Sequence, residues 1–299
     1  MTEEAIPAVP AEEQVPAAPA EEPSRVNRAF AGVGVAVGLI IWATVFPLPL
    51  AIPGWVVMKS HPRIGMFLGF LGLLLVVPGM LWKAKSVWGA DWRKALPLAR
   101  VSGGLLLWSL LNVLAYLALL VGLLLAVMVR WGPTALPNLP DPTTSVGVLG
   151  VVIGAPMAEE VLFRGYGLMR IRELGGDRRA LLLTALVFAL IHGSWLKLPI
   201  IFIVGLFLGW LVLRTGSLWP ALLAHLVNNG TLSLLGLLGG SQSAGASDLS
   251  NLSWTLALAL VVPGALALAV LWSPQVRGRI KELAPRPGGG NPETMESQA

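Results

Sequence analysis

The sequence predicts an all-α, polytopic membrane protein: a bundle of about eight transmembrane helices with disordered polar termini. Of its 299 residues, 55% are hydrophobic and only 12% are charged, whereas charged residues make up about a quarter of a soluble domain. The mean hydropathy is +0.74. Most charges lie between long apolar stretches, which is typical of helices that cross a bilayer.

The charge balance and the cysteine content exclude several classes of function. The net charge is +5, but the basic residues cluster at the ends of apolar segments, where orientation signals and lipid contacts belong. We therefore expect the lipid bilayer, and no nucleic acid, as a partner. The chain has no cysteine, which excludes disulfides, thiolate metal ligands and a cysteine nucleophile.

Both ends of the chain differ in composition from the middle. Residues 1–28 are rich in Pro, Ala and Glu, and residues 274–299 are polar and rich in Pro and Gly. Such segments cannot bury enough apolar surface to fold. We predict two disordered cytoplasmic tails on either side of a transmembrane helical domain, residues 29–273.

Eight segments of this domain are candidates for transmembrane helices, which need about 20 mostly apolar residues. The first is interrupted by Pro47, Pro49 and Pro53, and the fifth and sixth are short enough to be tilted or only partly spanning. In order, the predicted spans are 30–50, 64–82, 104–129, 146–169, 180–195, 198–213, 217–238 and 253–273.

The distribution of Lys and Arg predicts the orientation of these spans. With a cytoplasmic N-terminus, 16 basic residues lie in inside segments and four lie outside. Because basic residues collect in cytoplasmic loops, both termini are expected to be cytoplasmic. A bias toward Ala, Gly, Leu, Arg and Trp, with only six lysines, favours a bacterium with a GC-rich genome. The expected location is therefore the bacterial inner (plasma) membrane.

Three charges lie inside the fourth span: Glu159, Glu160 and Arg164. A charge near the bilayer centre costs at least roughly 2.5–3.5 kcal/mol, so such residues usually mark a working site. Glu160 and Arg164 are four residues apart, on one helix face, and can pair. Glu159 is rotated by about 100° from Glu160, which leaves it free to point toward a cavity.

Two later spans bring further polar groups to the same depth. By the helical rise, Glu159, His192, His225 and Asn229 all lie about 12–18 Å above the inner face. Phe188 precedes His192 by four residues, so its ring can brace the imidazole. We expect these groups to meet in one cavity.

Two chemistries fit this set. In the first, Glu159 and His192 activate a water molecule, and His225 and Asn229 donate hydrogen bonds to the oxyanion formed on an attacked carbonyl. In the second, Glu159, His192 and His225 are zinc ligands, since their types match those of catalytic zinc sites. No HExxH pair is present, so the spacing leaves both the metal-free and the zinc-dependent mechanism open.

Other functional classes can use the same residues. A proton-coupled transporter would relay protons through them, and a non-catalytic membrane binding or immunity protein would keep the cavity for binding alone. A relay spreads ionisable groups along a path through the membrane, whereas these groups lie at one level. The pattern therefore favours a site over a pathway.

Three motifs, in the fourth, fifth and seventh predicted spans, carry a resemblance to a known family. They are Glu159-Glu160-x-x-x-Arg164, Phe188-x-x-x-His192 and His225-x-x-x-Asn229. Together they resemble the motifs of the type II CAAX prenyl proteases, a family that includes the bacterial Abi, or bacteriocin-processing, membrane proteases. The resemblance covers a protease-like core at about 146–235.

The resemblance implies an intramembrane endopeptidase of about eight helices, glutamate- or metal-dependent, with a membrane-anchored protein or peptide as substrate. It implies that Glu159 and His192 activate water, that His225 and Asn229 stabilise the oxyanion, and that Glu160 and Arg164 complete the first motif. Zinc has been suggested as a cofactor for the family. Because bacteria generally lack protein prenylation, the resemblance does not imply a prenylated substrate here.

Overall fold

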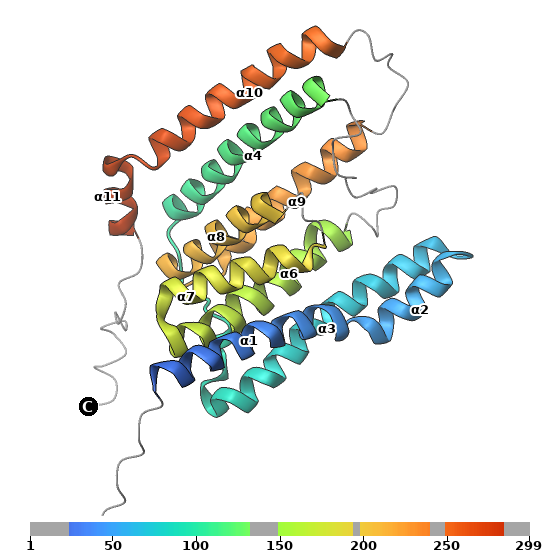
Figure 1. The fold of residues 1–299 in the computed structure, drawn as a ribbon, viewed down its shortest axis with the longest axis vertical. Coiled ribbons are helices and arrows are strands. Elements are labelled where there is room, and N and C mark those ends of the chain that lie inside the picture. The colour runs from blue at the N-terminus through green and yellow to red at the C-terminus, as the bar shows by residue number, and fades with distance from the viewer. Residues whose placement is uncertain (1–23, 132–148, 194–197, 240–248, 284–299) are drawn as a thin grey trace, which may run out of the picture.

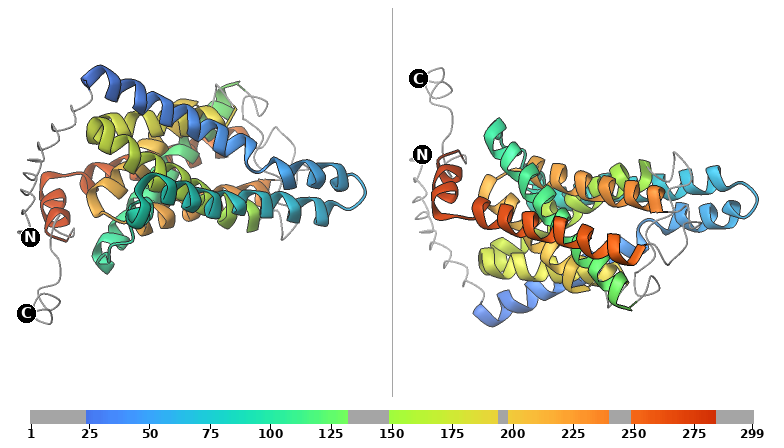
Figure 2. Two further views of the ribbon diagram at one scale, coloured as in Figure 1. Left: turned by 90° about the horizontal axis from the view of Figure 1, so that it is seen from below. Right: turned by 90° about the horizontal axis from the view of Figure 1, so that it is seen from above.

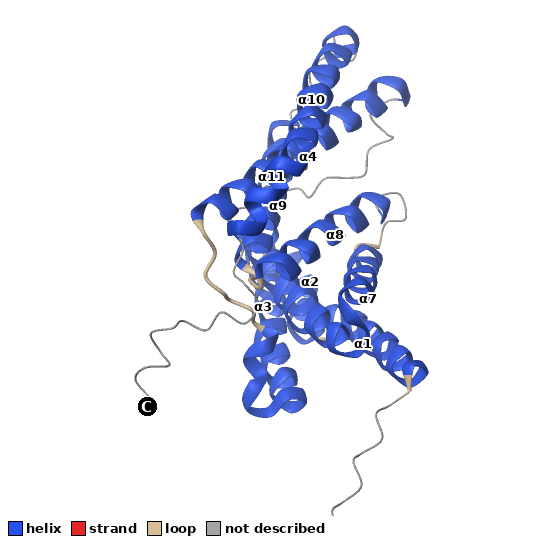
Figure 3. Ribbon diagram, turned by 90° about the vertical axis from the view of Figure 1, so that its left-hand side faces the viewer, coloured by secondary structure: helices blue, strands red, loops and turns tan. Residues whose placement is uncertain are grey.

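The computed structural model describes residues 24–131, 149–193, 198–239 and 249–283 (Figure 1). Within these ranges the regular elements are helices (Figure 3), and one isolated β-bridge joins Leu98 to Ser217. The predicted all-α, polytopic fold is confirmed. Five helical segments are long and apolar enough to cross a membrane: Val26–Met58, Pro62–Ala95, Gly103–Leu123, Leu198–Thr215 and Trp254–Leu271.

The helices follow one another along the chain with short connections. The first part contains α1 (Arg25–Val45), α2 (Leu48–Met58), α3 (Pro62–Trp88), the 3₁₀ helix η1 (Gly89–Ala95) and α4 (Gly103–Trp131). The central part contains η3 (Gly150–Gly154), α6 (Ala155–Glu159), η4 (Glu160–Gly167) and α7 (Leu168–Ile191). The last part contains α8 (Leu198–Thr215), α9 (Trp219–Gly239), α10 (Leu249–Leu271) and α11 (Pro274–Leu283).

The first predicted span is two helices instead of one. A turn at Phe46 and Pro47 separates α1 from α2, and α2 packs against α3 in a hairpin (Figure 1). Glycines allow this close packing, because a Cβ at Gly54 would lie 2.8 Å from the carbonyl oxygen of Gly65. Pro49 lies in the first turn of α2, where a proline costs no hydrogen bond, and Pro53 lies inside the helix, where one backbone donor is missing.

Helix extends into both predicted tails from the side of the transmembrane domain. Helix α1 starts at Arg25, before the predicted boundary at 29, because the Ser24 hydroxyl accepts a hydrogen bond from the Asn27 amide at 3.2 Å. Helix α11 occupies residues 274–283, and the Ser273 hydroxyl accepts from the Val276 amide at 3.5 Å. Such N-caps favour helix initiation. The predicted disorder of 1–23 and 284–299 falls outside the described residues.

The two ends of the described chain lie at the same end of the bundle. Figure 2 shows the start of α1 and helix α11 together at one end, with the α2–α3 turn at the other. Helix α7 bends at Gly176, which has a φ of +79°, and the predicted spans 146–169 and 180–195 lie on either side of this bend. That this end is cytoplasmic stays a prediction.

The segment from η3 to η4 lies at the centre of the bundle, in contact with α3 and α9, and η4 also contacts α1, η1 and α8. Glycines let it approach these neighbours. A Cβ at Gly165 would collide with the backbone carbonyl of Ala95, and one at Gly167 would meet the Leu39 side chain at 2.6 Å. Within the predicted fourth span, η4, which carries Glu160 and Arg164, is therefore buried by protein, whereas Ile153 and Met157 before it are exposed.

Candidate active site

The backbone around the two glutamates is wider than the regular α-helix predicted for 146–169. The turns of η3 and η4 are π-helical, and the short α6 lies between them. Pro156 removes one backbone donor from this stretch. The glycines of η3 and η4 weaken the intrinsic preference of this stretch for the α-helix. Wide turns of this kind occur frequently at functional sites, and here Glu159 and Glu160 stand at the junction between α6 and η4.

The predicted pair of Glu160 and Arg164 is confirmed. Arg164 Nη1 donates to Glu160 Oε1 at 2.9 Å, and both residues are 1% exposed. The second guanidinium nitrogen donates to the carbonyl of Gly205 on α8 at 3.4 Å. The guanidinium also lies over the Phe188 ring, 4.1 Å from its centre, so a charge that would be costly in the membrane has a carboxylate, a carbonyl and an aromatic face as partners.

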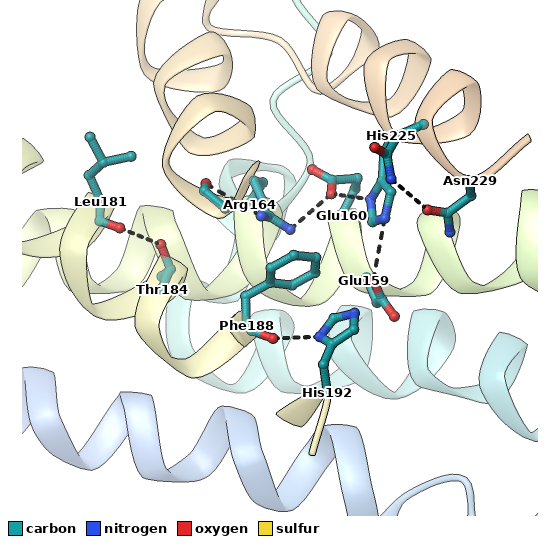
Figure 4. A network of polar contacts seen from close by, with 11 residues as sticks. Glu159, Glu160, Arg164, Leu181, Thr184, Phe188, His192, His225 and Asn229 are labelled. Atoms are coloured by element: carbon teal, nitrogen blue, oxygen red, sulfur yellow. Dashed lines mark hydrogen bonds and ion pairs between the residues drawn. The ribbon is translucent and has the colours of Figure 1, made fainter. Parts of the chain in front are cut away.

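His225 links α9 to both glutamates (Figure 4). Its Nδ1 donates to Glu160 Oε1 at 2.8 Å, and its Nε2 lies 3.6 Å from Glu159 Oε2, too far for a hydrogen bond. Because a carboxylate only accepts, the proton of the neutral ring is on Nδ1. The Nε2 atom then accepts when the ring is neutral and donates when it is charged.

His192 reaches the site from the end of a helix, and not from within a span as predicted for 180–195. Helix α7 ends at Ile191, and Gly193 has a φ of +63°, a conformation that favours glycine and terminates helices. His192 Nδ1 donates to the Phe188 carbonyl at 2.7 Å. The Phe188 ring meets both imidazoles edge-on, with centroids 4.8 Å from His192 and 5.8 Å from His225.

Asn229 is held from two sides. Its Nδ2 donates to the carbonyl of Val151 in η3 at 2.9 Å, and its Oδ1 accepts from Asn228 Nδ2 at 3.1 Å. Sequence reasoning missed Asn228, although the adjacent pair of asparagines in an apolar helix was a readable signal. It also missed the carbonyls of Val151 and Gly205, which no side-chain pattern can indicate.

The predicted site residues therefore converge from three parts of the chain. Figure 4 shows Glu159 from α6, His192 from the end of α7, and His225 and Asn229 from α9 around one place. The Oε2 atoms of Glu159 and Glu160 are buried and have no hydrogen-bond partner. Among the described residues, Glu159 and His192 form no direct hydrogen bond, so joint action on water requires the water to lie between them.

Residues 141–231 match a family model described as Rce1-like: type II CAAX prenyl endopeptidase Rce1-like. We call residues 141–231 the Rce1-like segment, because they are similar to this family. The match confirms the resemblance drawn from the motifs, includes every predicted site residue, and spans less than a third of the chain. Neither the curated proteins nor the solved structures contain a match to the chain.

The Rce1-like segment supports, at the level of the family, a protease embedded in a bilayer with a peptide as substrate. The long apolar helices around it belong to an integral membrane protein.

The zinc hypothesis can be tested on the side chains of the Rce1-like segment. Each imidazole commits Nδ1 to a hydrogen bond, as metal-binding histidines do. However, no three His, Asp or Glu side chains in the described parts of the chain are grouped closely enough to hold a metal ion. Glu159, His192 and His225, as they lie, do not form the predicted ligand set and do not fit a zinc site.

Proposed function

We propose that this chain is an intramembrane endopeptidase that hydrolyses a peptide bond near the C-terminus of a membrane-associated protein or peptide, using water activated by Glu159. The observation that carries the proposal is the convergence of Glu159, two imidazoles and the Asn229 amide inside the Rce1-like segment.

Glu159 is the general base in this mechanism. Its carboxylate is surrounded by protein and partly exposed, at 20% of the side-chain area, and one of its oxygens has no partner. It takes a proton from water while the water oxygen attacks the substrate carbonyl carbon. His192 Nε2, which has no proton in the neutral ring because Nδ1 donates to Phe188, accepts the second hydrogen bond of that water.

His225 supplies the first oxyanion donor. Its Nε2 lies 3.6 Å from Glu159 Oε2, beside the proposed base. When Glu159 accepts the proton, the negative charge moves to the substrate oxygen, and His225 Nε2 can donate to it.

Asn229 supplies the second oxyanion donor. One of its amide hydrogens is used by the Val151 carbonyl, and the other is available to the substrate oxygen. When the tetrahedral intermediate collapses, Glu159 returns its proton to the leaving nitrogen, the carbon–nitrogen bond breaks, and a carboxylic acid and an amine are released.

A proton-coupled transporter and a non-catalytic binding or immunity protein are the alternatives. Among the described residues, the buried acidic and basic side chains are Glu160, Arg164 and His225. They form one cluster without extending toward either membrane face, which favours a site over a proton path.

The decisive experiment compares Glu159→Gln with the wild type in proteoliposomes, using a pool of lipid-anchored peptides with varied C-terminal residues and mass spectrometry of the products. We expect the variant to lose hydrolysis completely while keeping its melting temperature, since the substitution removes the base and keeps the shape. Glu173→Gln, the same substitution at the surface residue bonded to Trp88, should keep full activity. Undiminished cleavage by Glu159→Gln would exclude Glu159 as the base.

A further inference from the structure

The corner between the end of α3 and η1, residues 82–95, carries positive charges that no carboxylate balances. Its basic residues are Lys83, Lys85, Arg93 and Lys94, and its one acidic residue is Asp91. Asp91 is bonded to Lys94 at 3.0 Å. Within the part of the chain that the structure describes, the other three cations form no ion pair. The α3–η1 corner therefore presents an excess of positive charge.

Two of these cations lie near one tryptophan ring. The Nζ atom of Lys85 is 5.5 Å from the centre of the Trp92 ring, and the guanidinium carbon of Arg93 is 5.8 Å from it. Both cations are exposed, whereas Trp92 is half-buried and packs against the hydrophobic core. The ring attracts each cation without neutralising its charge, and like charges repel each other. An anion bound at this corner would relieve that repulsion.

Trp82 places this corner at the surface of the membrane. Its side chain is 67% exposed, on a helical segment long and apolar enough to cross a membrane, and exposed tryptophans of such segments collect at the membrane–water interface. Lys85 follows on the same helix face, about 4.5 Å farther along the axis. Figure 1 shows the end of α3 at the same end of the bundle as the start of α1. The cations therefore lie at the depth of lipid headgroups.

A lipid phosphate is the anion that suits this position. It carries a negative charge at this depth, and its acyl chains can lie in the bilayer beside Trp82. Membrane surfaces that contain anionic lipids attract Lys and Arg side chains near them. We propose that the α3–η1 corner binds the headgroups of anionic phospholipids through Lys85 and Arg93, with Lys83 adding to the positive charge and Trp92 anchoring the corner to the core.

The α3–η1 corner also packs on η4. Ala95, the last residue of η1, is buried, and its carbonyl lies against Gly165 in η4. Just before η1, Trp88 donates to Glu173 at 2.9 Å, and its ring meets that of Tyr166 edge-on, with the centroids 5.5 Å apart. Bound headgroups should therefore restrain η1 and, through these contacts, η4. Headgroup binding and this restraint can both be measured without any peptidase activity.

Binding can be tested by titrating the detergent-solubilised protein with phosphatidylglycerol or phosphatidylcholine of identical acyl chains. A ligand that binds only the folded protein raises its melting temperature. We expect a larger rise with phosphatidylglycerol. The variant Lys85→Gln/Arg93→Gln should weaken the apparent affinity for this lipid about 25-fold, since each basic residue near an anionic surface contributes about fivefold. Equal shifts with the two lipids, or an unchanged affinity in the variant, would overturn the proposal.

The matched control is Lys94→Gln/Arg172→Gln, which changes the net charge by the same amount. Both side chains are already paired with carboxylates, Lys94 with Asp91 and Arg172 with Asp177, so the affinity for phosphatidylglycerol should fall much less. An equal loss in the two double variants would assign the effect to net charge and overturn the site. Stabilisation of the wild type by polyglutamate as strong as that by phosphatidylglycerol would assign the corner to an acidic protein segment instead.

Hydrogen exchange tests the restraint on η4, because amide exchange reports local opening. With phosphatidylglycerol, the amides of η4 should exchange more slowly than with phosphatidylcholine, and this difference should disappear in Lys85→Gln/Arg93→Gln. Slower exchange confined to η4 and η1 would support the link between headgroup binding and η4. Unchanged exchange alongside selective binding of phosphatidylglycerol would overturn that link and support the binding site alone.

Discussion

Helix η4 at the centre of the bundle and helix α10 at its periphery meet the membrane in opposite ways. Along Trp254–Leu271 in α10, the mean hydropathy is 2.3 and only 11% of the window is buried by protein. In η4, which ends the central segment from η3 to η4, seven of the eight residues are buried, Glu160 and Arg164 among them. Apolar surface faces lipid in one helix, and charge faces protein in the other.

The difference shows where polar groups can be kept in a bilayer. Arg164 and Glu160 are paired with each other and with groups from α7, α8 and α9. Each partner offsets part of the desolvation cost, so the cluster is stable only as a unit. In α10 no such compensation is needed, because its side chains match the surrounding hydrocarbon.

Removing one member of the unit should have the largest effect on stability. Arg164→Ala leaves Glu160 buried without its guanidinium, and breaking a buried ion pair from one side costs roughly 3–5 kcal/mol. We expect a strongly lowered melting temperature in detergent, or loss of expression. Arg214→Ala, which removes an exposed arginine beside Trp210, is the matched control and should melt near the wild type.

The double variant Arg164→Ala/Glu160→Gln tests whether the loss comes from the stranded charge. The introduced glutamine is neutral and can still accept a hydrogen bond from His225, so part of the stability should return. If the double variant melted no higher than Arg164→Ala, packing against Phe188 would account for the loss, and the ion pair would not.

The second effect, on catalysis, concerns the α9 donors. His225→Ala and Asn229→Ala should each lower kcat by about 10²–10³-fold, which is typical for loss of one oxyanion donor. KM should change much less, because these donors act mainly in the transition state. Steady-state kinetics on a single cleaved peptide separate the two parameters. Variants with altered KM and normal kcat would assign these residues to substrate binding.

The same contrast explains what the sequence could predict. The lengths of the apolar stretches predicted helices that cross the membrane, and the four-residue spacing of Glu160 and Arg164 predicted their ion pair. The sequence did not indicate the π-helical turns of η3 and η4. The close packing of Gly165 on the Ala95 carbonyl could not be predicted either, because the two residues are far apart in the chain. The link from His225 to Glu160 joins residues 65 positions apart, and only the packing of α9 on the central segment creates it.

A third effect separates close packing from helix propensity. Gly165→Ala places a Cβ against the Ala95 carbonyl, and overpacking typically costs about 1–3 kcal/mol. Gly38→Ala on α1 meets nothing within 4 Å, so the better helix former should stabilise by up to about 1 kcal/mol. Opposite shifts in melting temperature are expected. A neutral Gly165→Ala would mean that the central segment can move away from η1.

The smallest effect should come from the lipid-facing side of the comparison. Leu266 on α10 is 62% exposed, so Leu266→Ala removes surface that contacts lipid tails as apolar as itself. The melting temperature should stay close to that of the wild type, within the roughly ±0.5 kcal/mol typical of exposed positions. Leu208→Ala on α8, where the side chain is 1% exposed, makes the same substitution inside the protein. It should cost about 2–5 kcal/mol. If Leu266→Ala were equally damaging, a partner surface would cover α10 in the membrane, and the division into a lipid-facing α10 and a protein-covered η4 would fail.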